Sequence, residues 1–210
     1  RLTKQEDHFE YFPKFSRDGN SIVFTSWNDE KLGAVRSVDL RSGQETVLTK
    51  EAGKYQEPTF SPDGKQVVFV KVRGGYLTTP WHGLNTGVYA VSAGGKTEPR
   101  LLTDEGSAPQ FGKENDYVYL TRTEHTGEVD WSTSLIRFKL DKSEQAAVAK
   151  GEFVEDFAIS PDGAWLAFNE RFHAYVAPMP LAGKAVAVGS KMDGLPVRQL
   201  DVNAGEYLHW

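Results

Sequence analysis

The stretch "FSPDG" at residues 60–64 decides the fold, because it recurs along the chain. Close copies are "FSRDG" at 15–19 and "ISPDG" at 159–163. Pro62 presets the backbone for the first central position of a tight turn, Asp63 suits the second, and Gly64 accepts a positive φ. The motif therefore predicts a recurring turn between two strands, and not a catalytic centre.

Apolar residues at the start of each motif mark a regular repeat. The marker positions lie 45, 51, 48 and 51 residues apart, and they are Phe15, Phe60, Phe111, Ile159 and Trp210. This period is typical of a propeller blade of four strands, which takes about 40 to 50 residues. Each unit has a second half that indicates two further strands around a Gly or Asp turn, as in "AVRSVDLRSGQETVLT" (34–49) and "AYVAPMPLAGKAVAVG" (174–189). The sequence therefore predicts an all-β protein, a β-propeller with four-stranded antiparallel blades.

The repeat sets the expected organisation of the chain, which we take as one propeller region over residues 1–210. The expected units cover approximately 11–50, 56–104, 107–150 and 154–190, with 205–210 as the start of a further unit. In the third unit "GKEN" replaces "SPDG", so we expect a longer or differently shaped turn there. "RLT" at 1–3 looks like the close of a preceding unit. We therefore expect about four blades of an incomplete ring, or of a larger ring of about six to eight blades.

Composition excludes several classes of partner and site. The 24 basic and 29 acidic side chains give a net charge of −5 without long runs of one sign. We therefore expect no nucleic-acid partner and no polybasic membrane patch. The absence of cysteine excludes disulfides, thiolate metal sites and a cysteine nucleophile in this sequence. No apolar stretch is long enough to cross a bilayer, so membrane insertion is not expected.

Two connections are unusually long for hairpins and are expected on the face opposite the Ser-Pro-Asp-Gly turns. They span 71–87 and 122–134, and they carry Tyr76, Trp81, His82, His125, Asp130 and Trp131. Long loops on one rim of a rigid scaffold often bind partners, and Trp and Tyr are enriched in interface hot spots. These six residues are therefore candidates for a contact rim. The alternative is that Trp81 and Trp131 only cover their own loops or wedge between blades.

The sequence indicates no catalytic, cofactor-binding or metal residue. None of the five histidines has the spacing of a metal-ligand motif. No Gly-x-Ser-x-Gly elbow supplies a serine nucleophile. Glu124 with Asp130, or Glu155 with Asp156, could in principle pair for acid and base work, but acidic residues in loops are usually solvated. We expect no cofactor in this chain, and an activity assay on it should be blank.

The repeats resemble the propeller repeats of TolB, of tricorn-type proteases and of prolyl oligopeptidase relatives. The matching pattern is Pro-x-Phe-Ser-Pro-Asp-Gly, an apolar strand and a closing Leu-Thr, here Leu48-Thr49 and Leu102-Thr103. More narrowly, "YLTTPWHGLNTGVYAVSAGGK" and the order of the units resemble the propeller region that precedes the catalytic domain in large bacterial amidohydrolases. That region is TolB-like and is fused to a metal-dependent hydrolase.

The narrower resemblance implies a non-catalytic propeller of a larger hydrolase that acts on carbon–nitrogen bonds. The chain would then dock on or gate the catalytic domain of the same parent chain, and a divalent metal of the zinc type would lie in that domain. The alternative is a TolB-like protein–protein interaction module, and a second alternative is the propeller filter of a prolyl oligopeptidase-like serine peptidase. The resemblance also implies a periplasmic or secreted protein. Whether the chain is itself part of an enzyme stays open.

Overall fold

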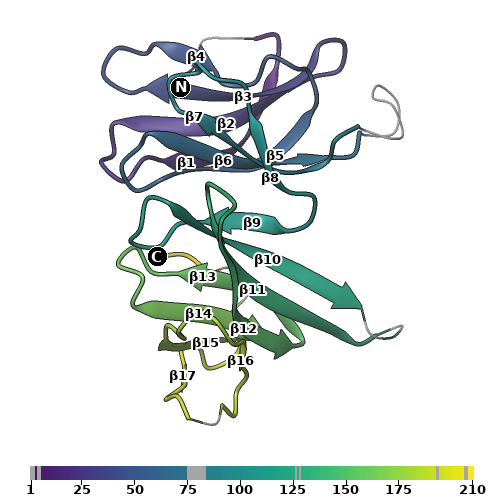
Figure 1. Cartoon of the computed structure of the whole chain (residues 1–210), viewed down its shortest axis with the longest axis vertical. Helices are drawn as coiled ribbons and strands as arrows, with labels where there is room; N and C mark the ends of the chain where they lie inside the picture. Colours follow the sequence, from purple (N-terminus) through teal and green to yellow (C-terminus); the bar gives the residue numbers. More distant parts are fainter. Residues whose placement is uncertain are drawn as a thin grey trace. The chain divides into compact units, whose positions relative to one another are not determined.

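A computed structural model describes residues 3, 6–74, 84–125, 127, 129–192, 194–205 and 208–210. All regular elements over these residues are β-strands, β1 to β17 (Figure 1). The all-β prediction is therefore confirmed. The chain divides into two compact units, Arg1–Pro109 and Gln110–Trp210.

The first unit contains two four-stranded antiparallel sheets, each with its strands in chain order. The first blade consists of β1 (Phe9–Phe15), β2 (Ser21–Asn28), β3 (Leu32–Asp39) and β4 (Glu45–Val47). The second blade consists of β5 (Lys54–Phe60), β6 (Gln66–Val72), β7 (Gly87–Ser92) and β8 (Arg100–Thr103). This arrangement is the four-stranded meander predicted for a propeller blade.

The second unit contains the third and fourth blades, and β9 of the third begins in the last residues of the first unit. The third blade consists of β9 (Ser107–Gln110), β10 (Tyr117–His125), β11 (Trp131–Lys139) and β12 (Gln145–Glu152), with β16 (Val186–Ala187) added at its edge. The fourth blade consists of β13 (Val154–Ile159), β14 (Trp165–Glu170), β15 (His173–Pro178) and β17 (Arg198–Gln199). The prediction of four-stranded antiparallel blades is confirmed, with β16 as a parallel addition.

The recurring turn forms as the sequence predicts. The Ser61 hydroxyl donates to the Asp63 carboxylate over 2.7 Å, and the Gly64 amide donates to the Ser61 carbonyl over 2.9 Å. Gly64 has a φ of 70°, as do Gly19 and Gly163 in the two copies of the motif. In the third blade Phe111 lies six residues before Tyr117, the first residue of β10, as Phe60 lies six residues before Gln66 of β6. The "GKEN" turn therefore has the same length but another shape, because residues 113, 115 and 116 are bends where residues 62 and 63 form a hydrogen-bonded turn. Of the two expectations, the differently shaped turn is confirmed and the longer turn is not.

Each unit has its own apolar core, which lies between its two sheets. In the first unit the core joins Val23, Val35 and Leu48 of the first blade and its closing segment to Tyr55, Phe60, Val67, Phe69 and Val91. In the second unit it joins Leu135, Val148 and Ala149 to Val154, Phe157, Ile159, Leu166, Phe168, Tyr175, Ala177 and Val188. Alternation along the strands places most of these residues on the face that meets the neighbouring blade. The adjacent Val148 and Ala149 both join the core because the β11–β12 pairing has a bulge at Leu135/Ile136.

The outer part of the fourth blade differs from the sequence-based expectation. The pattern in 174–189 predicts two strands paired through a Gly turn, but β15 pairs with β17. The segment between them instead pairs β16 in parallel with β12 of the third blade, Ala149 opposite Val186. The Val188 amide extends this pairing by donating to the Lys150 carbonyl over 2.9 Å. The chain thus crosses to the third blade and returns before it closes the fourth.

Candidate interaction site

The 122–134 stretch forms a long hairpin, and the expectation of a long loop there is wrong. Strands β10 and β11 stay paired as far as His125 opposite Trp131, so only residues 126–130 connect them. Thr123 and Thr133 face each other with their hydroxyls 3.2 Å apart. Thr and Trp favour strands, and cross-strand hydroxyl pairs add support, so this polar stretch can continue as strand where apolar alternation has ended.

Trp131 fastens this hairpin to the fourth blade. Its indole Nε1–H donates to the Val154 carbonyl over 3.3 Å, and the buried Thr133 hydroxyl donates to the same carbonyl over 2.6 Å. The indole meets the Phe153 ring edge to face, with centroids 5.2 Å apart. Trp131 thus packs against the start of the next blade, which is the wedging role that the sequence left open. The ring is nevertheless only half-buried.

A cation completes a row of side chains that we call the Trp131–Phe153–Arg171 stack. The Arg171 guanidinium carbon lies 4.7 Å from the centroid of the Phe153 ring. The backbone joins the same three residues, because the Phe153 amide donates to the Trp131 carbonyl and the Arg171 amide to the Phe153 carbonyl. Those bonds are 3.1 and 2.9 Å long. The stack is therefore held both by its side chains and by its main chain.

The backbone of the stack is strained. Phe153 and Arg171 have φ values of 56° and 59°, in the left-handed region that favours glycine. Each such residue costs about 1 to 3 kcal/mol, and such residues cluster at binding and catalytic sites. The strain gives each bulky side chain its place in the row. Arg171 lies in the two-residue connection between β14 and β15, where hairpin turns commonly use a positive φ, whereas Phe153 is the single residue between β12 and β13. The strain at Phe153 therefore motivates a functional hypothesis for this rim.

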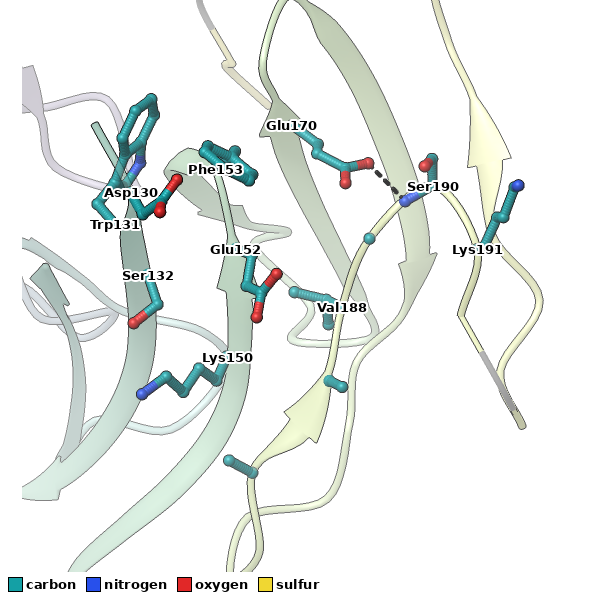
Figure 2. A pocket seen from close by; sticks show the side chains of 13 residues that line it. Asp130, Trp131, Ser132, Lys150, Glu152, Phe153, Glu170, Val188, Ser190 and Lys191 are labelled. Carbon is teal, nitrogen blue, oxygen red and sulfur yellow. Dashed lines mark hydrogen bonds between the residues drawn. The ribbon is translucent and has the colours of Figure 1, made fainter. Parts of the chain in front are cut away.

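A hollow of about 930 Å³ lies beside the stack (Figure 2). It is lined by side chains from the hairpin, the ends of β12 and β14, and the β16 segment, among them Asp130, Trp131, Glu152, Phe153, Glu170 and Val188. The Ser190 amide donates to the Glu170 carboxylate over 2.7 Å, which ties the returning β16 segment to the end of β14. The crossing segment thus supplies one wall of the hollow.

The structure brings together only some of the residues proposed from sequence. Asp130 and Trp131 line the hollow, and His125 lies opposite Trp131 on the exposed end of the hairpin. Tyr76, Trp81 and His82 lie outside the described residues. Glu124 forms an ion pair with Lys150, with 3.3 Å between the Lys150 Nζ and a Glu124 oxygen. Asn169 lies between Glu155 and Asp156, donating to the Glu155 carboxylate and accepting from the Asp156 amide.

Sequence reasoning missed Glu152, Phe153 and Glu170. Phe153 lies between β12 and β13. Its ring contact with Trp131 depends on a left-handed backbone at Phe153, which a phenylalanine in the sequence does not indicate. Glu152 and Glu170 end their strands and look like ordinary solvated carboxylates. The one local signal was the aromatic residue directly between a polar strand end and the apolar "VEDFAI" strand. Only the register of β11, β12 and β13 shows that these positions meet.

Two further histidines, His173 and His8, have local partners. His173 Nδ1 lies 2.8 Å from the Asp201 carboxylate, and this hydrogen bond is the largest cause of the lowered pKa of Asp201. His8 Nδ1 lies 2.9 Å from the neighbouring Asp7. No group of three or more His, Asp or Glu side chains placed to hold a metal occurs among the described residues. Nor does any helix within the described ranges have the length and apolarity to span a membrane.

Comparison with known proteins supports a TolB-like propeller fold. No protein-family model matches the chain. The Tol-Pal system protein TolB of Francisella tularensis subsp. mediasiatica is 32% identical over 73 residues, which are 35% of this chain and 17% of that protein. The TolB protein of subsp. holarctica (strain OSU18) matches with the same figures. The chain thus matches less than a fifth of the length of these curated relatives.

Solved structures agree on the fold. TolB from Acinetobacter baumannii superposes with a TM-score of 0.59 at 18% identity, over 97% of this chain and 46% of that chain. The oligogalacturonate lyase of Vibrio parahaemolyticus gives 0.65 at 14% identity, over 87% and 55%. The tricorn protease gives 0.58 at 9% identity, over 94% and 24%. Such low identities establish the propeller fold alone, and these matches give no support to the amidohydrolase resemblance.

Proposed function

We propose that the chain is a TolB-like protein-interaction module that binds a partner protein at the hollow and at the Trp131–Phe153–Arg171 stack. The carrying observation is the stack itself, a half-buried Trp, a Phe and an Arg held on a strained backbone beside a hollow of about 930 Å³. Trp and Arg dominate interface hot spots, where a partner completes the burial of rings that are only partly covered. Trp131 belongs to the paired strand β11, and backbone hydrogen bonds tie Phe153 to Trp131 and Arg171 to Phe153, so the site is preorganised for binding.

The likeness to curated TolB proteins supports a partner within a Tol-Pal type of system. The proposal extends to this chain the assembly named for those relatives, on the basis of a 73-residue match. It includes the periplasmic or secreted location that the resemblance of the repeats implies. Binding through a propeller rim needs no catalytic group in the chain, which fits the absence of any nucleophile or metal motif in the sequence.

The amidohydrolase reading remains an untested alternative. It would make this propeller the docking surface of a catalytic domain that carries a divalent metal, and the prolyl oligopeptidase reading would require a serine nucleophile elbow in that domain. Both are decided by the parent gene. A downstream His-x-His strand end would favour the first, a Gly-x-Ser-x-Gly elbow the second, and neither would be needed for the interaction module.

Site-specific photo-crosslinking tests the interaction module. A benzoylphenylalanine replaces the exposed Lys191 at the edge of the hollow, which leaves Glu152 and the stack intact, and in a control it replaces the exposed Glu30 in the β2–β3 connection of the first blade. After irradiation in the source cells, we expect a discrete protein adduct from position 191 and none of that mass from position 30. Adducts that are absent at position 191, or identical at both positions, would overturn the proposal.

The aromatic stack is tested in the same experiment. Trp131→Leu removes the indole and its hydrogen bond to the Val154 carbonyl, while the hydrophobic contact with Phe153 partly remains. We expect the adduct from position 191 to weaken by about tenfold, as for the loss of an aromatic hot spot. The melting temperature of the variant, measured in parallel, separates lost binding from lost folding. An undiminished adduct from a folded variant would exclude the stack from the interface.

A further inference from the structure

The acidic and basic side chains that line the hollow point in different directions. Figure 2 shows Glu152 extending toward Val188 and Asp130 toward Phe153, so that both carboxylates border the open space. Lys150 extends in the opposite direction from Glu152, where its Nζ lies 3.3 Å from the Glu124 carboxylate. Lys191 lies beyond Ser190, with its ammonium group turned away from Val188. The hollow therefore presents the Glu152 carboxylate to a guest, while the two lysines that line it point elsewhere.

A buried hydroxyl without a partner lies next to one of these carboxylates. Ser132 is 5% exposed and lines the hollow. Its Oγ is buried and has no hydrogen-bond partner within the part of the chain that the structure describes. Ser132 stands directly opposite Glu152 across β11 and β12, so the two side chains share one face of the sheet. An unsatisfied buried hydroxyl is costly, and a guest that donates hydrogen bonds would satisfy it.

The aromatic wall already binds a cation of the same kind. The Arg171 guanidinium lies over the Phe153 ring at 4.7 Å. Trp131 meets that ring edge to face and borders the same hollow, and Trp is the aromatic residue that attracts cations most strongly. The aliphatic stem of a long basic side chain also packs well on rings while its charged head stays among polar groups.

We propose that the hollow receives a basic side chain of the partner protein, with Arg fitting better than Lys. A guanidinium carries five N–H donors in a planar fork, which can serve Glu152 and the Ser132 hydroxyl together. Trp131 and Phe153 form the apolar wall for its stem. This inference rests on the proposed function, since it names the chemistry by which the same site recognises its partner.

A pair of short peptides tests the charge requirement directly. The probes are acetyl-Ala-Ala-Arg-Ala-Ala-amide and the same peptide with citrulline, which keeps the shape of Arg without its charge. They are titrated into the ¹⁵N-labelled chain, with the Trp131 indole N–H and the Ser132 amide as reporters. We expect the Arg peptide to shift both signals and to bind about tenfold more tightly than the citrulline peptide. Equal affinities, or no shift from either peptide, would overturn the proposal.

Two substitutions locate the binding groups. Glu152→Gln keeps the size of the side chain and removes its charge, so we expect the affinity for the Arg peptide to fall about tenfold and that for the citrulline peptide to stay the same. Ser132→Ala removes the unsatisfied hydroxyl and should lower the affinity for both peptides. Glu30→Gln is the matched control, an exposed carboxylate in the first blade, and should change neither. An unaffected Glu152→Gln variant would contradict the assignment.

The peptide titration and the crosslinking experiment can fail separately. If the Arg and citrulline peptides bind alike while position 191 still captures a discrete protein, the interaction site stands and the basic guest is wrong. If the Arg peptide binds as expected while position 191 captures nothing, the hollow binds cations but the proposed function fails. Added NaCl gives an internal check, because an ion-pairing guest loses affinity as salt screens the carboxylates.

Discussion

The first strands of the first and second blades, β1 and β5, have similar sequences but differ in solvent exposure. β1 reads "FEYFPKF" and β5 reads "KYQEPTF", and both have a bulge at the same position before their second strand. Phe15 and Phe60 end these strands opposite Ile22 and Val67 respectively. Yet Phe15 is 68% exposed and Phe60 is 8% exposed.

The difference shows that an innermost strand is buried by the neighbouring sheet. Phe60 joins a core with Val23, Val35 and Leu48 from the first blade, whereas every residue of β1 is exposed. Strand pairing within a blade therefore does not create the core. The stabilising contacts come from sheet packed on sheet, as in other propellers, so the same side chain has a different energetic role in each blade.

The largest expected effect is the loss of the covered ring. Phe60→Ala should destabilise the chain by about 3 to 5 kcal/mol, because it removes a buried ring and leaves a cavity. Phe15→Ala should change the free energy of unfolding by no more than about 0.5 kcal/mol, as for an exposed site. Urea titration of both variants measures the difference. Similar losses at the two positions would mean that β1 is covered in solution.

The turns that follow these strands should not differ between the blades. Gly64→Val and Gly19→Val each place a β-branched side chain at a φ of 70°, with open space around the added Cβ. Because only the backbone is strained, each should cost about 1 to 3 kcal/mol. The melting temperatures of the two variants should therefore fall together. A much larger effect in either blade would indicate that its turn also takes part in packing.

Sequence reasoning succeeded where the determinants are local or repeated. The turn follows from the chemistry of Pro62, Asp63 and Gly64, and the blade follows from alternation and period. Sequence reasoning failed where a segment of the fourth blade pairs with a strand of the third blade. The β16 segment follows β15 by a Gly turn, as a fourth strand would, and nothing in "KAVAVG" indicates that it pairs in parallel with β12.

The candidate site was only half visible for the same reason. Trp131 and Asp130 stand out as unusual residues in a polar stretch, so sequence reasoning selected them. Their partners Glu152 and Phe153 lie at and directly after the C-terminal end of β12. The hydrogen bond between the Trp131 indole and the Val154 carbonyl depends on the register in which β11 pairs with β12. The prediction placed the pair in a loop because apolar alternation ends near Arg122, although hydrogen bonding between the strands continues to His125.

The bulges in β1 and β5 differ in one contact, and from this difference we predict a smaller effect on stability. Phe12 and Glu57 have φ values of 53° and 51° at equivalent positions. The Glu57 carboxylate also accepts the Ala108 amide over 2.7 Å, whereas Phe12 is exposed. Phe12→Gly should stabilise the chain by about 0.5 to 1 kcal/mol by relieving strain.

Glu57→Gly relieves the same strain but leaves the Ala108 amide without this acceptor. The lost hydrogen bond to a charged group costs about 1.5 to 3 kcal/mol, so this variant should be less stable than the parent chain. Thermal unfolding of the two glycine variants measures the difference between them. A stabilised Glu57→Gly variant would mean that the carboxylate contributes nothing beyond its place in the bulge.

The smallest expected effect is a pH dependence shared by the two turns. The Ser16 hydroxyl and the Asn20 amide donate to the Asp18 carboxylate and lower its pKa from 3.8 to about 2, and the Ser61 hydroxyl lowers the pKa of Asp63 in the same way. A carboxyl whose pKa is lower in the folded state stabilises the fold above pH 3.8, and this contribution is lost as the pH falls toward 2.

Asp18→Asn should therefore flatten the decline of the melting temperature over this pH range, and Asp63→Asn should do the same. Both carboxylates are exposed, so each change should be small. Carboxyl ¹³C titration checks the pKa values directly. Asp18 follows the uncovered strand β1 and Asp63 the covered strand β5, so a depressed pKa at both positions would show that the turn holds its geometry without the neighbouring sheet. An ordinary pKa at Asp18 alone would instead make the turn depend on the packing that Phe60 has and Phe15 lacks.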